Sequence, residues 1–552
     1  MIATDQLLEQ LGYHESNSFL PKESLRGVTA FSHVFRRAIQ NCGLIGVYTL
    51  RRSWDTQDST IVPVIYVCEV QTSDAADQIH RLIWNQNIVP FALVKTLNEI
   101  RVYSGFAYRR DSDDQTATKV LKKTVAIHEI ASELVPSFHA HRIDDGTLWR
   151  REGQFVTPNT RVDWKLLSNL DTLGRILREH MGLSLRASQS LIGKYVYLRY
   201  LRDRQILSPE KLAEFGVIAE DVFSRNATLP ALKMLISRLD EWLNGAIFDI
   251  PWQDGIQAVH IREVAGAFFG DDPETGQLNL FEDYDFSYIP IETLSVVYEQ
   301  FLHATGKAQK TGAYYTPIPL VNFVLDALEE LQPLRAGMRV LDPACGSGAF
   351  LVQSYRRLVE KEVVKRQKLR PVELRELLQR YIFGIDRDEA ACQVAELSLI
   401  LTLLDYITPP DLTKTNFKLP MLRGKNIFGG LNEDFFNTQS VFHQTAGRLH
   451  FDWVVGNPPW TEISTAHPLE QDSVALHWKN ERSQQYPTGG NQVAELFVWK
   501  ATEHIDSKGV IGLLLPAMTL FKDESTAFRQ RFFQICKVES VINFANLVEV
   551  HR

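Results

Sequence analysis

Asn457, Pro458, Pro459 and Trp460 follow one another directly after the apolar run 451–456. Proline fixes φ and carries no N–H, so this pair predicts a rigid turn at the end of a buried strand. The asparagine oxygen and a proline carbonyl are acceptors, and the indole supplies an aromatic face. Such a set suits gripping an exocyclic amino group and stacking its ring, which frees the nitrogen lone pair for attack on an electrophile. An ordinary turn after a core strand is the alternative.

A glycine-rich turn lies upstream, in residues 340–351, where an apolar run leads through Gly346 and Gly348 into a predicted helix. Glycine lets the backbone approach a ligand closely, and a helix N-terminus offers free N–H groups. The spacing is neither GxGxxG nor a phosphate-binding P-loop. A tight turn between strand and helix, without any ligand, is the alternative.

Two further positions could bind a ligand. Asp386 ends the next predicted strand, where an acid can bind a ribose diol, although it could equally cap the following helix. Thr316 precedes Pro317 and Pro319 at the start of a predicted helix over 320–331, and it could cap that helix.

The elements that position these residues alternate along residues 301–552. Predicted strands cover 339–342, 381–386, 451–455, 509–515 and 538–544, and predicted helices cover 349–368, 389–404, 494–505 and 526–535. This alternation predicts an α/β fold with a doubly wound, mostly parallel sheet. Ligands of such sheets bind at the carboxyl ends of the strands, where the motifs above fall.

The rest of the chain predicts two more domains, which gives three at 1–135, 136–300 and 301–552. Residues 1–135 look mixed α/β, with strands at 63–71, 91–94 and 100–103 and a helix at 75–86. Residues 136–300 are mostly helical, as apolar spacing over 166–183 and 187–204 indicates. The basic and aromatic residues at 194–202 predict a packed helix, with DNA phosphate contact as the alternative.

Composition is that of a soluble globular protein, with 45% hydrophobic and 23% charged residues. The net charge of −8 counts against tight autonomous binding of nucleic acid. The five cysteines form no CxxC pair or Cys/His cluster, so neither a disulfide framework nor a zinc site is predicted. We find no membrane span and no signal peptide, and we expect a cytoplasmic protein.

The order of the motifs at 311–317, 340–351, 384–386 and 457–460 resembles the N6-adenine DNA methyltransferases of the γ motif order. Within them it is most similar to the type IIG restriction-modification and the phage-defence methyltransferases of the BREX and DISARM kind. The resemblance covers about residues 290–552. It implies transfer of a methyl group from S-adenosylmethionine to adenine N6 in double-stranded DNA.

The resemblance also assigns roles to residues. Thr316 would hold the methionine carboxylate of the cofactor, and Asp386 its ribose. The remaining cofactor residues that it implies are Asp342, Ala344, Gly346 and Gly348 around the methionine and Asn426 at the adenine. The target adenine would be gripped and stacked by Asn457, Pro458, Pro459 and Trp460.

Two departures from the family pattern stand out. Trp460 replaces the usual tyrosine or phenylalanine, and the sequence stops at Arg552, where the family has further strands and a target-recognition domain. We therefore expect a partner chain or a further C-terminal segment to carry DNA recognition. One alternative is a cofactor-binding but inactive subunit that needs that partner. Another is a methyltransferase that acts on a protein glutamine.

The N-terminal part resembles the nuclease-like domain at the front of type I and type IIG restriction chains. Such nucleases pair an upstream acid with Glu-x-Lys to hold Mg²⁺. Here Glu69 is followed by Gln71 in place of the lysine, and the upstream acid could be Asp55 or Asp58. We expect a degenerate domain and no metal, with Glu69 as a ligand only if the domain is active.

Overall fold

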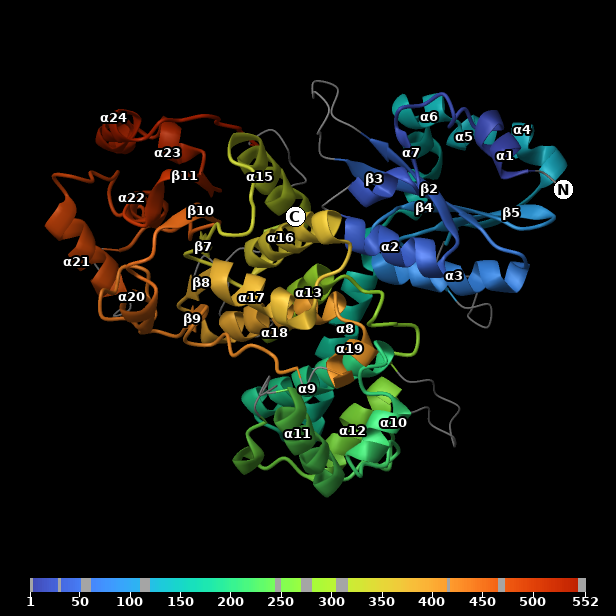
Figure 1. Cartoon of the computed structure of the whole chain (residues 1–552), viewed down its shortest axis with the longest axis horizontal. Helices are drawn as coiled ribbons and strands as arrows, with labels where there is room; N and C mark the ends of the chain where they lie inside the picture. The colour runs from blue at the N-terminus through green and yellow to red at the C-terminus, as the bar shows by residue number, and fades with distance from the viewer. Residues whose placement is uncertain are drawn as a thin grey trace. The chain divides into compact units, whose positions relative to one another are not determined.

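The computed structural model describes residues 3–27, 31–50, 61–109, 120–243, 250–269, 280–303, 316–414, 417–464 and 472–544. The chain divides into two compact units (Figure 1), one of Met1–Arg238 with Phe248–Val297 and one of Leu239–Ile247 with Tyr298–Arg552. The division into three domains stays a prediction, because compactness alone does not tell how many parts fold independently.

The first unit contains a six-stranded sheet whose strands lie in sequence order. Its strands are β1 (Phe19–Pro21), β2 (Leu44–Leu50), β3 (Val62–Glu69), β4 (Phe91–Lys95), β5 (Glu99–Ser104) and β6 (Lys122–Ala126). Strands β3 and β4 are parallel because helix α3 (Ser73–Gln86) connects them, and the other neighbours are antiparallel. The predicted strands and helix of this region are confirmed, whereas β1, β2 and β6 were not predicted.

Helices cover both faces of this sheet. One face packs against α1 (Thr4–Gln10) and the short helices α4 (Ile130–Glu133), α5 (Val135–Phe138), α6 (Ala140–Asp144) and α7 (Thr147–Glu152). The other face packs against α2 (Ser32–Asn41) and α3. Strands buried on both sides read as continuous apolar runs, which is how residues 63–68 appear in the sequence.

Most of the helical region belongs to the same unit, whereas the last residues of α11 and α13 belong to the second unit. The main helices of this region are α8 (Val162–Arg175), which continues as a π-helical turn at Ile176–His180, α9 (Leu185–Asp203), α10 (Pro209–Glu214), α11 (Leu229–Leu243), α12 (Ala258–Phe269) and α13 (Ile291–His303). Helix α9 is buried on most of its circumference. The basic residues on its buried faces must therefore find partners inside the protein.

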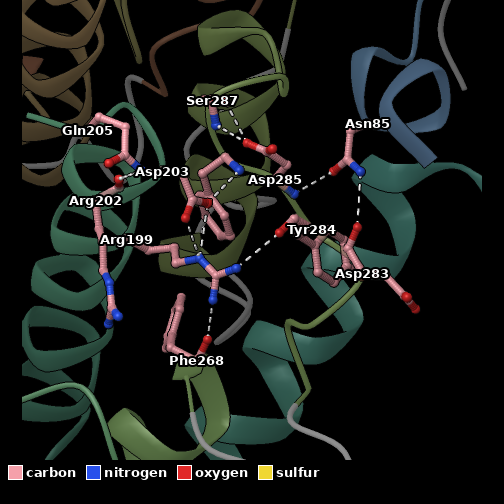
Figure 2. Close-up of polar contacts among 11 residues, drawn as sticks. Asn85, Arg199, Arg202, Asp203, Gln205, Phe268, Asp283, Tyr284, Asp285 and Ser287 are labelled. Carbon is pink, nitrogen blue, oxygen red and sulfur yellow. Dashed lines mark hydrogen bonds and ion pairs between the residues drawn. The ribbon is translucent and has the colours of Figure 1, made fainter. Parts of the chain in front are cut away.

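Those partners are visible around Arg199 (Figure 2). The Arg199 guanidinium donates from Nε to the Asp203 carboxylate at 3.0 Å, from Nη2 to the Tyr284 carbonyl at 3.2 Å, and from Nη1 to the Phe268 carbonyl. Arg202 lies over two phenylalanine rings. The interpretation of residues 194–202 as a packed helix is confirmed, because these two arginines are used within the fold.

Asn85 ties the loop beside this cluster to the sheet (Figure 2). Its Nδ2 donates to the Asp283 carbonyl at 3.0 Å, and its Oδ1 accepts from the Asp285 N–H at 3.0 Å. Asn85 lies on α3, which packs on the sheet, whereas Tyr284 of the same loop binds Arg199 on α9. The helical region and the N-terminal sheet are joined by these bonds within one unit.

The second unit contains a five-stranded sheet in which all strands are parallel. The strands are β7 (Val340–Asp342), β8 (Ile382–Asp386), β9 (Ile427–Gly429), β10 (Phe451–Gly456) and β11 (Ile505–Leu513), in the order β11-β10-β7-β8-β9. Strands β8 and β9 follow on one side of β7, and β10 and β11 follow on its other side. Ligands of such sheets bind beside the strand at which the order reverses, at its carboxyl end.

Helices alternate with these strands, as predicted. They are α15 (Ile318–Leu331), α16 (Ala349–Arg366), α17 (Pro371–Tyr381), α18 (Glu389–Asp405), α19 (Pro409–Lys414), α20 (Val441–Thr445), α21 (Ser473–Arg482), α22 (Val493–Thr502), α23 (Met518–Phe521) and α24 (Thr526–Ile535). The unit is therefore α/β. The predicted strand at 538–544 is wrong: that segment is irregular and mostly exposed, and no described strand pairs with it.

Of the helices in the described residues, none is both long and apolar enough to cross a bilayer.

Candidate active site

The candidate site lies where β7 and β10 end side by side. Trp453 and Val454 of β10 pair with Val340 and Leu341 of β7, so Asp342 and Gly456 reach the same edge of the sheet. A Cβ placed on Gly456 would lie 2.6 Å from Asp342 Oδ1, closer than side chains pack. Glycine at this position therefore lets the backbone that leads into Asn457 lie directly against the Asp342 carboxyl.

Asn457 presents an acceptor that the fold does not use. Its Nδ2 donates to Thr316 Oγ1 at 3.1 Å, whereas its Oδ1 is buried and has no hydrogen-bond partner in the part of the chain that the structure describes. A buried acceptor without a partner costs about 1–3 kcal/mol. The amide is thus held at one end and left unsatisfied at the other, as an acceptor that awaits a ligand would be.

The turn after Asn457 is held by two backbone groups of one residue, Leu514. The Leu514 N–H donates to the Gly456 carbonyl at 3.0 Å, and the Leu514 carbonyl accepts from Trp460 Nε1 at 3.2 Å. Pro458 is buried, and Pro459 and Trp460 are partly exposed. Since Leu514 directly follows β11, the edge strand of the sheet fixes both ends of the turn and the orientation of the indole. Sequence reasoning missed Leu514 because only its backbone takes part.

Thr316 lies beside Asn457 and does not cap a helix. Pro317 is the N-cap of α15 and makes no side-chain capping bond, so the expectation that Thr316 caps this helix is wrong. The Thr316 hydroxyl binds the Asn457 amide instead, and the residue is 9% exposed. The preceding motif residues 311–315 lie outside the described residues.

The glycine-rich turn takes the conformation that glycine permits. Gly346 and Gly348 have φ of +50° and +85°, and Gly348 is the N-cap of α16. A Cβ on Gly348 would lie 3.0 Å from Ala395 Cβ of α18, so the turn also packs tightly. The Ala344 N–H donates to Asp342 Oδ1 at 3.1 Å, which closes the turn over the end of β7. The first turn of α16 is thereby set at the carboxyl edge of the sheet.

Asp386 organises this turn from the neighbouring strand. Its Oδ2 accepts from the Gly346 N–H and its Oδ1 from the Asp388 N–H, both at 2.9 Å. Asp388 caps α18 by accepting from Ala390 and Ala391, so the alternative that Asp386 is the cap is wrong. A carboxylate oxygen has two lone pairs, which leaves each Asp386 oxygen able to accept one more bond, for example from a diol.

Both acids of the site are hard to ionise. Burial raises the pKa of Asp342 well above its usual value, and the nearby Asp386 carboxylate raises it further. Burial also raises the pKa of Asp386. Two carboxyl groups that share a region of low dielectric favour a ligand that brings hydroxyl donors or a positive charge.

Asn426 does not have the position that the sequence predicts. Its Nδ2 donates to the carbonyls of Gln379 and Ile382 at 2.9 and 2.8 Å, and it directly precedes β9, at the amino end of that strand. Ile382 is the first residue of β8, at the edge of the sheet opposite to Asp386. This geometry gives Asn426 a structural role and does not support the expected contact with a cofactor adenine.

A packed helix lies in the segment between Trp460 and Asn491. Trp478 of α21 is buried at 2% exposure against Phe436 and Tyr486. The guanidinium of Arg387, next to Asp386, donates to Asp472 at 2.9 Å just before this helix. This helix was not predicted, because the apolar residues of the segment are too few to be conspicuous in the sequence.

The N-terminal sheet places Glu69 in a different setting. Lys95 Nζ lies 2.5 Å from Glu69 Oε1, and the Thr4 hydroxyl donates to Oε2 at 3.0 Å. The Lys95 ammonium lowers the pKa of Glu69. Asp55 and Asp58 lie outside the described residues. Among the residues that are described, no group of three or more histidine, cysteine or acidic side chains could hold a metal ion.

Comparison with known proteins gives one family model and several relatives. The family described as N-6 DNA Methylase matches residues 290–548. A type II restriction enzyme and methyltransferase of Escherichia coli, RM.Eco57I, is 22% identical over 65% of this chain and 38% of its own length. The type I restriction enzyme EcoEI methylase subunit of Escherichia coli is 20% identical over 64% of this chain and 60% of its own length.

A third relative, the type I restriction enzyme HindI methylase subunit of Haemophilus influenzae, is 32% identical over 39% of this chain and 49% of its own length. The chain thus spans between 38% and 60% of the length of these three relatives. The matched segment contains β7 to β11 with the glycine-rich turn, Asp386 and the Asn457–Trp460 turn. Residues 290–548 are thus similar in sequence to the N-6 DNA Methylase family.

Proposed function

We propose that this protein transfers a methyl group from S-adenosylmethionine to adenine N6 in double-stranded DNA, as part of restriction-modification or phage defence. One observation carries the proposal: Asn457 Oδ1 is a buried acceptor without a partner among the described residues, three residues before an indole that a hydrogen bond to Leu514 holds in place. An acceptor kept from water attracts a donor such as the N–H of an exocyclic amino group.

The cofactor would lie over the carboxyl ends of β7 and β8. Gly346 and Gly348 let the turn lie close to the methionine part, and the free N–H groups at the start of α16 face the same region. Asp386 has lone pairs left for the two ribose hydroxyls. The raised pKa values of Asp342 and Asp386 favour a ligand that carries a positive charge there. When bound, S-adenosylmethionine supplies an activated methyl group on its sulfonium.

The protein's own residues would orient and polarise the base. Asn457 Oδ1 and the Pro458 carbonyl accept the two N–H bonds of the amino group, which turns the nitrogen lone pair out of ring conjugation. Trp460 stacks on the ring and holds its plane. Because Oδ1 is shielded from solvent, the base reaches it only when neighbouring residues shift.

We further propose that DNA recognition comes from additional polypeptide, either a partner chain or a further segment. Around the end of the described chain, large apolar side chains are exposed: Met518 by 58%, Phe521 by 64% and Phe533 by 56%. Exposed apolar side chains on the two successive helices α23 and α24 support a protein contact there. The sheet order with its reversal at β7 supports a doubly wound methyltransferase sheet.

For the first unit we propose a nuclease-like domain over residues 1–135 that has lost its activity, followed by a helical linker or DNA-contact domain over 136–300. Lys95 and Thr4 both occupy the carboxylate of Glu69, the one acid of the expected motif that is described. A carboxylate that is neutralised by a lysine at 2.5 Å is a poor ligand for Mg²⁺.

Transfer of labelled methyl groups to DNA tests the methyltransferase proposal. Wild-type protein should bind S-adenosylmethionine and label adenine N6 in unmethylated genomic DNA. Asn457→Ala should reduce labelling about 100- to 1,000-fold, the usual cost of losing one group that stabilises a transition state. Its affinity for the cofactor should stay unchanged. Asn480→Ala, which removes an exposed asparagine on α21, is the matched control and should label normally. A folded wild-type protein that binds no cofactor would refute the proposal.

A further inference from the structure

The hydrogen bond between Thr316 and Asn457 connects two positions 141 residues apart in sequence. A threonine hydroxyl is both a donor and an acceptor. In the structure Thr316 Oγ1 accepts from Asn457 Nδ2, and no described group accepts the Thr316 proton. That proton is therefore available to an acceptor that the described residues do not supply.

This chemistry leaves two orientations open to the Asn457 amide. In the first, Nδ2 donates to Thr316 and Oδ1 is presented as an acceptor, as in the structure. In the second, the amide is turned over, Thr316 donates to Oδ1, and the NH₂ group is presented instead. Only the first orientation can accept a hydrogen bond from the amino group of adenine. The Thr316 hydroxyl can form a hydrogen bond with either orientation of the amide, so another group must select between the two orientations.

We propose that Thr316 is a positioning residue that makes the grip of Asn457 on the base depend on the bound cofactor. This inference rests on the proposed function. Once the Thr316 hydroxyl donates a hydrogen bond to an acceptor of the cofactor, Oγ1 can only accept a bond from Asn457. The Asn457 amide must then donate from Nδ2 to Thr316 and present Oδ1 to the base. The carboxylate of the methionine part is the anionic group of the cofactor, and hydrogen bonds to an ionised acceptor are roughly twice as strong as neutral ones.

Thermodynamic reciprocity sets the expected effect. If cofactor binding selects the orientation that accepts from adenine, it strengthens binding of the adenine amino group, and the amino group strengthens cofactor binding equally. Couplings of this kind are typically about 5- to 150-fold. The affinity for a target base that lacks the amino group should not increase when the cofactor binds, because such a base donates no hydrogen bond to Oδ1.

The test compares two DNA duplexes in the sequence that the protein methylates in cells, one with adenine and one with unsubstituted purine at the target position. Equilibrium affinities are measured with and without saturating sinefungin, an unreactive cofactor analogue that keeps the carboxylate. In wild type, sinefungin should raise the preference for adenine over purine about 5- to 150-fold. Thr316→Val should remove this increase, and Thr316→Ser should restore it.

A second measurement on the wild-type protein does not depend on the folding of any variant. Saturating 5′-methylthioadenosine, which lacks the carboxylate, should leave the preference for adenine unchanged. An equal increase with this compound, or an increase that persists in Thr316→Val, would overturn the inference while leaving the methyltransferase proposal intact. Absence of cofactor binding or of methyl transfer in the wild type would instead refute the proposed function itself.

Discussion

Two polar sites lie at the carboxyl ends of parallel strands, one in each unit, and they differ in how their polar groups are satisfied. At the ends of β3 and β4, Glu69 receives hydrogen bonds from Lys95 and Thr4, and its pKa is lowered. At the ends of β7 and β10, Asn457 Oδ1 has no partner among the described residues, and Asp342 has a raised pKa. Groups that a fold leaves unsatisfied mark a ligand site better than residue types do.

Apart from removal of the Asn457 amide, the largest effect that separates the two regions is expected from Gly456→Ala. The new Cβ would lie 2.6 Å from Asp342 Oδ1, so the strand end that carries Asn457 must shift. A displacement near 1 Å can cost about 100-fold in rate, which we expect in methyl transfer. Gly337→Ala is the control, because its φ of +105° is strained but nothing lies within 4 Å. Equal losses of transfer in both variants would mean that backbone strain, not the collision, is responsible.

Removal of the indole should have the next largest effect. Trp460→Ala loses the stacking surface, and base stacking on an aromatic side chain is worth about 1–3 kcal/mol. We expect binding of DNA that carries the target adenine to weaken by about 5- to 150-fold, measured in the presence of sinefungin. Trp460→Phe should keep most of the affinity, since it retains an aromatic face without the bond to Leu514. An unchanged affinity in Trp460→Ala would place the base elsewhere.

The opposite pKa directions predict opposite stability effects. A raised pKa means that the folded state holds the Asp342 proton more tightly than the unfolded chain does, so ionisation destabilises the fold as pH rises above 3.8. Asp342→Asn should therefore raise the free energy of unfolding at pH 7 and impair cofactor binding. The difference from wild type should shrink as the pH is lowered toward 3.8. Denaturant unfolding at several pH values measures this, and a destabilised variant at pH 7 would contradict it.

Glu69→Gln should have the smallest effect. The lowered pKa of Glu69 stabilises the fold above pH 4.5, and this contribution disappears as the pH falls through the lowered value. Because the side chain is 39% exposed, the loss at pH 7 should stay below about 1 kcal/mol. Methyl transfer should be unchanged. The wild-type protein should not cleave DNA in the presence of Mg²⁺. If it does, and Glu69→Gln abolishes the cleavage, Glu69 is part of a catalytic site and the contrast between the two sites is wrong.

Much of the second unit could be predicted because its strands are short apolar runs that alternate with longer helical segments. The residue types alone identify the glycine-rich turn and the Asn457–Trp460 turn. The prediction at 538–544 failed because an apolar run forms a strand only where a neighbour offers hydrogen bonds. Strand β9 was missed because its two apolar residues are followed by glycines and by no motif, whereas the equally short β7 leads into the glycine-rich turn.

The contacts that define the site could not be predicted. The bond between Thr316 and Asn457 joins distant positions, and either residue could have served locally as a cap or turn residue. Leu514 acts only through its backbone N–H and carbonyl, so its residue type gives no sign of its role. Asn426 was assigned from the types of its neighbouring residues, but the pairing of β8 with β9 places it at the amino ends of these strands, away from Asp386.

The most direct test of the central claim is mass spectrometry of DNA from cells that lack other adenine methyltransferases and express this protein together with its natural genomic neighbours. Wild type should produce N6-methyladenine, and Asn457→Ala should reduce it at least 100-fold at equal protein level. Asn457→Asp, which keeps an acceptor at the same position, should retain measurable methylation. N6-methyladenine at the wild-type level in Asn457→Ala would contradict the claim that this amide grips the base.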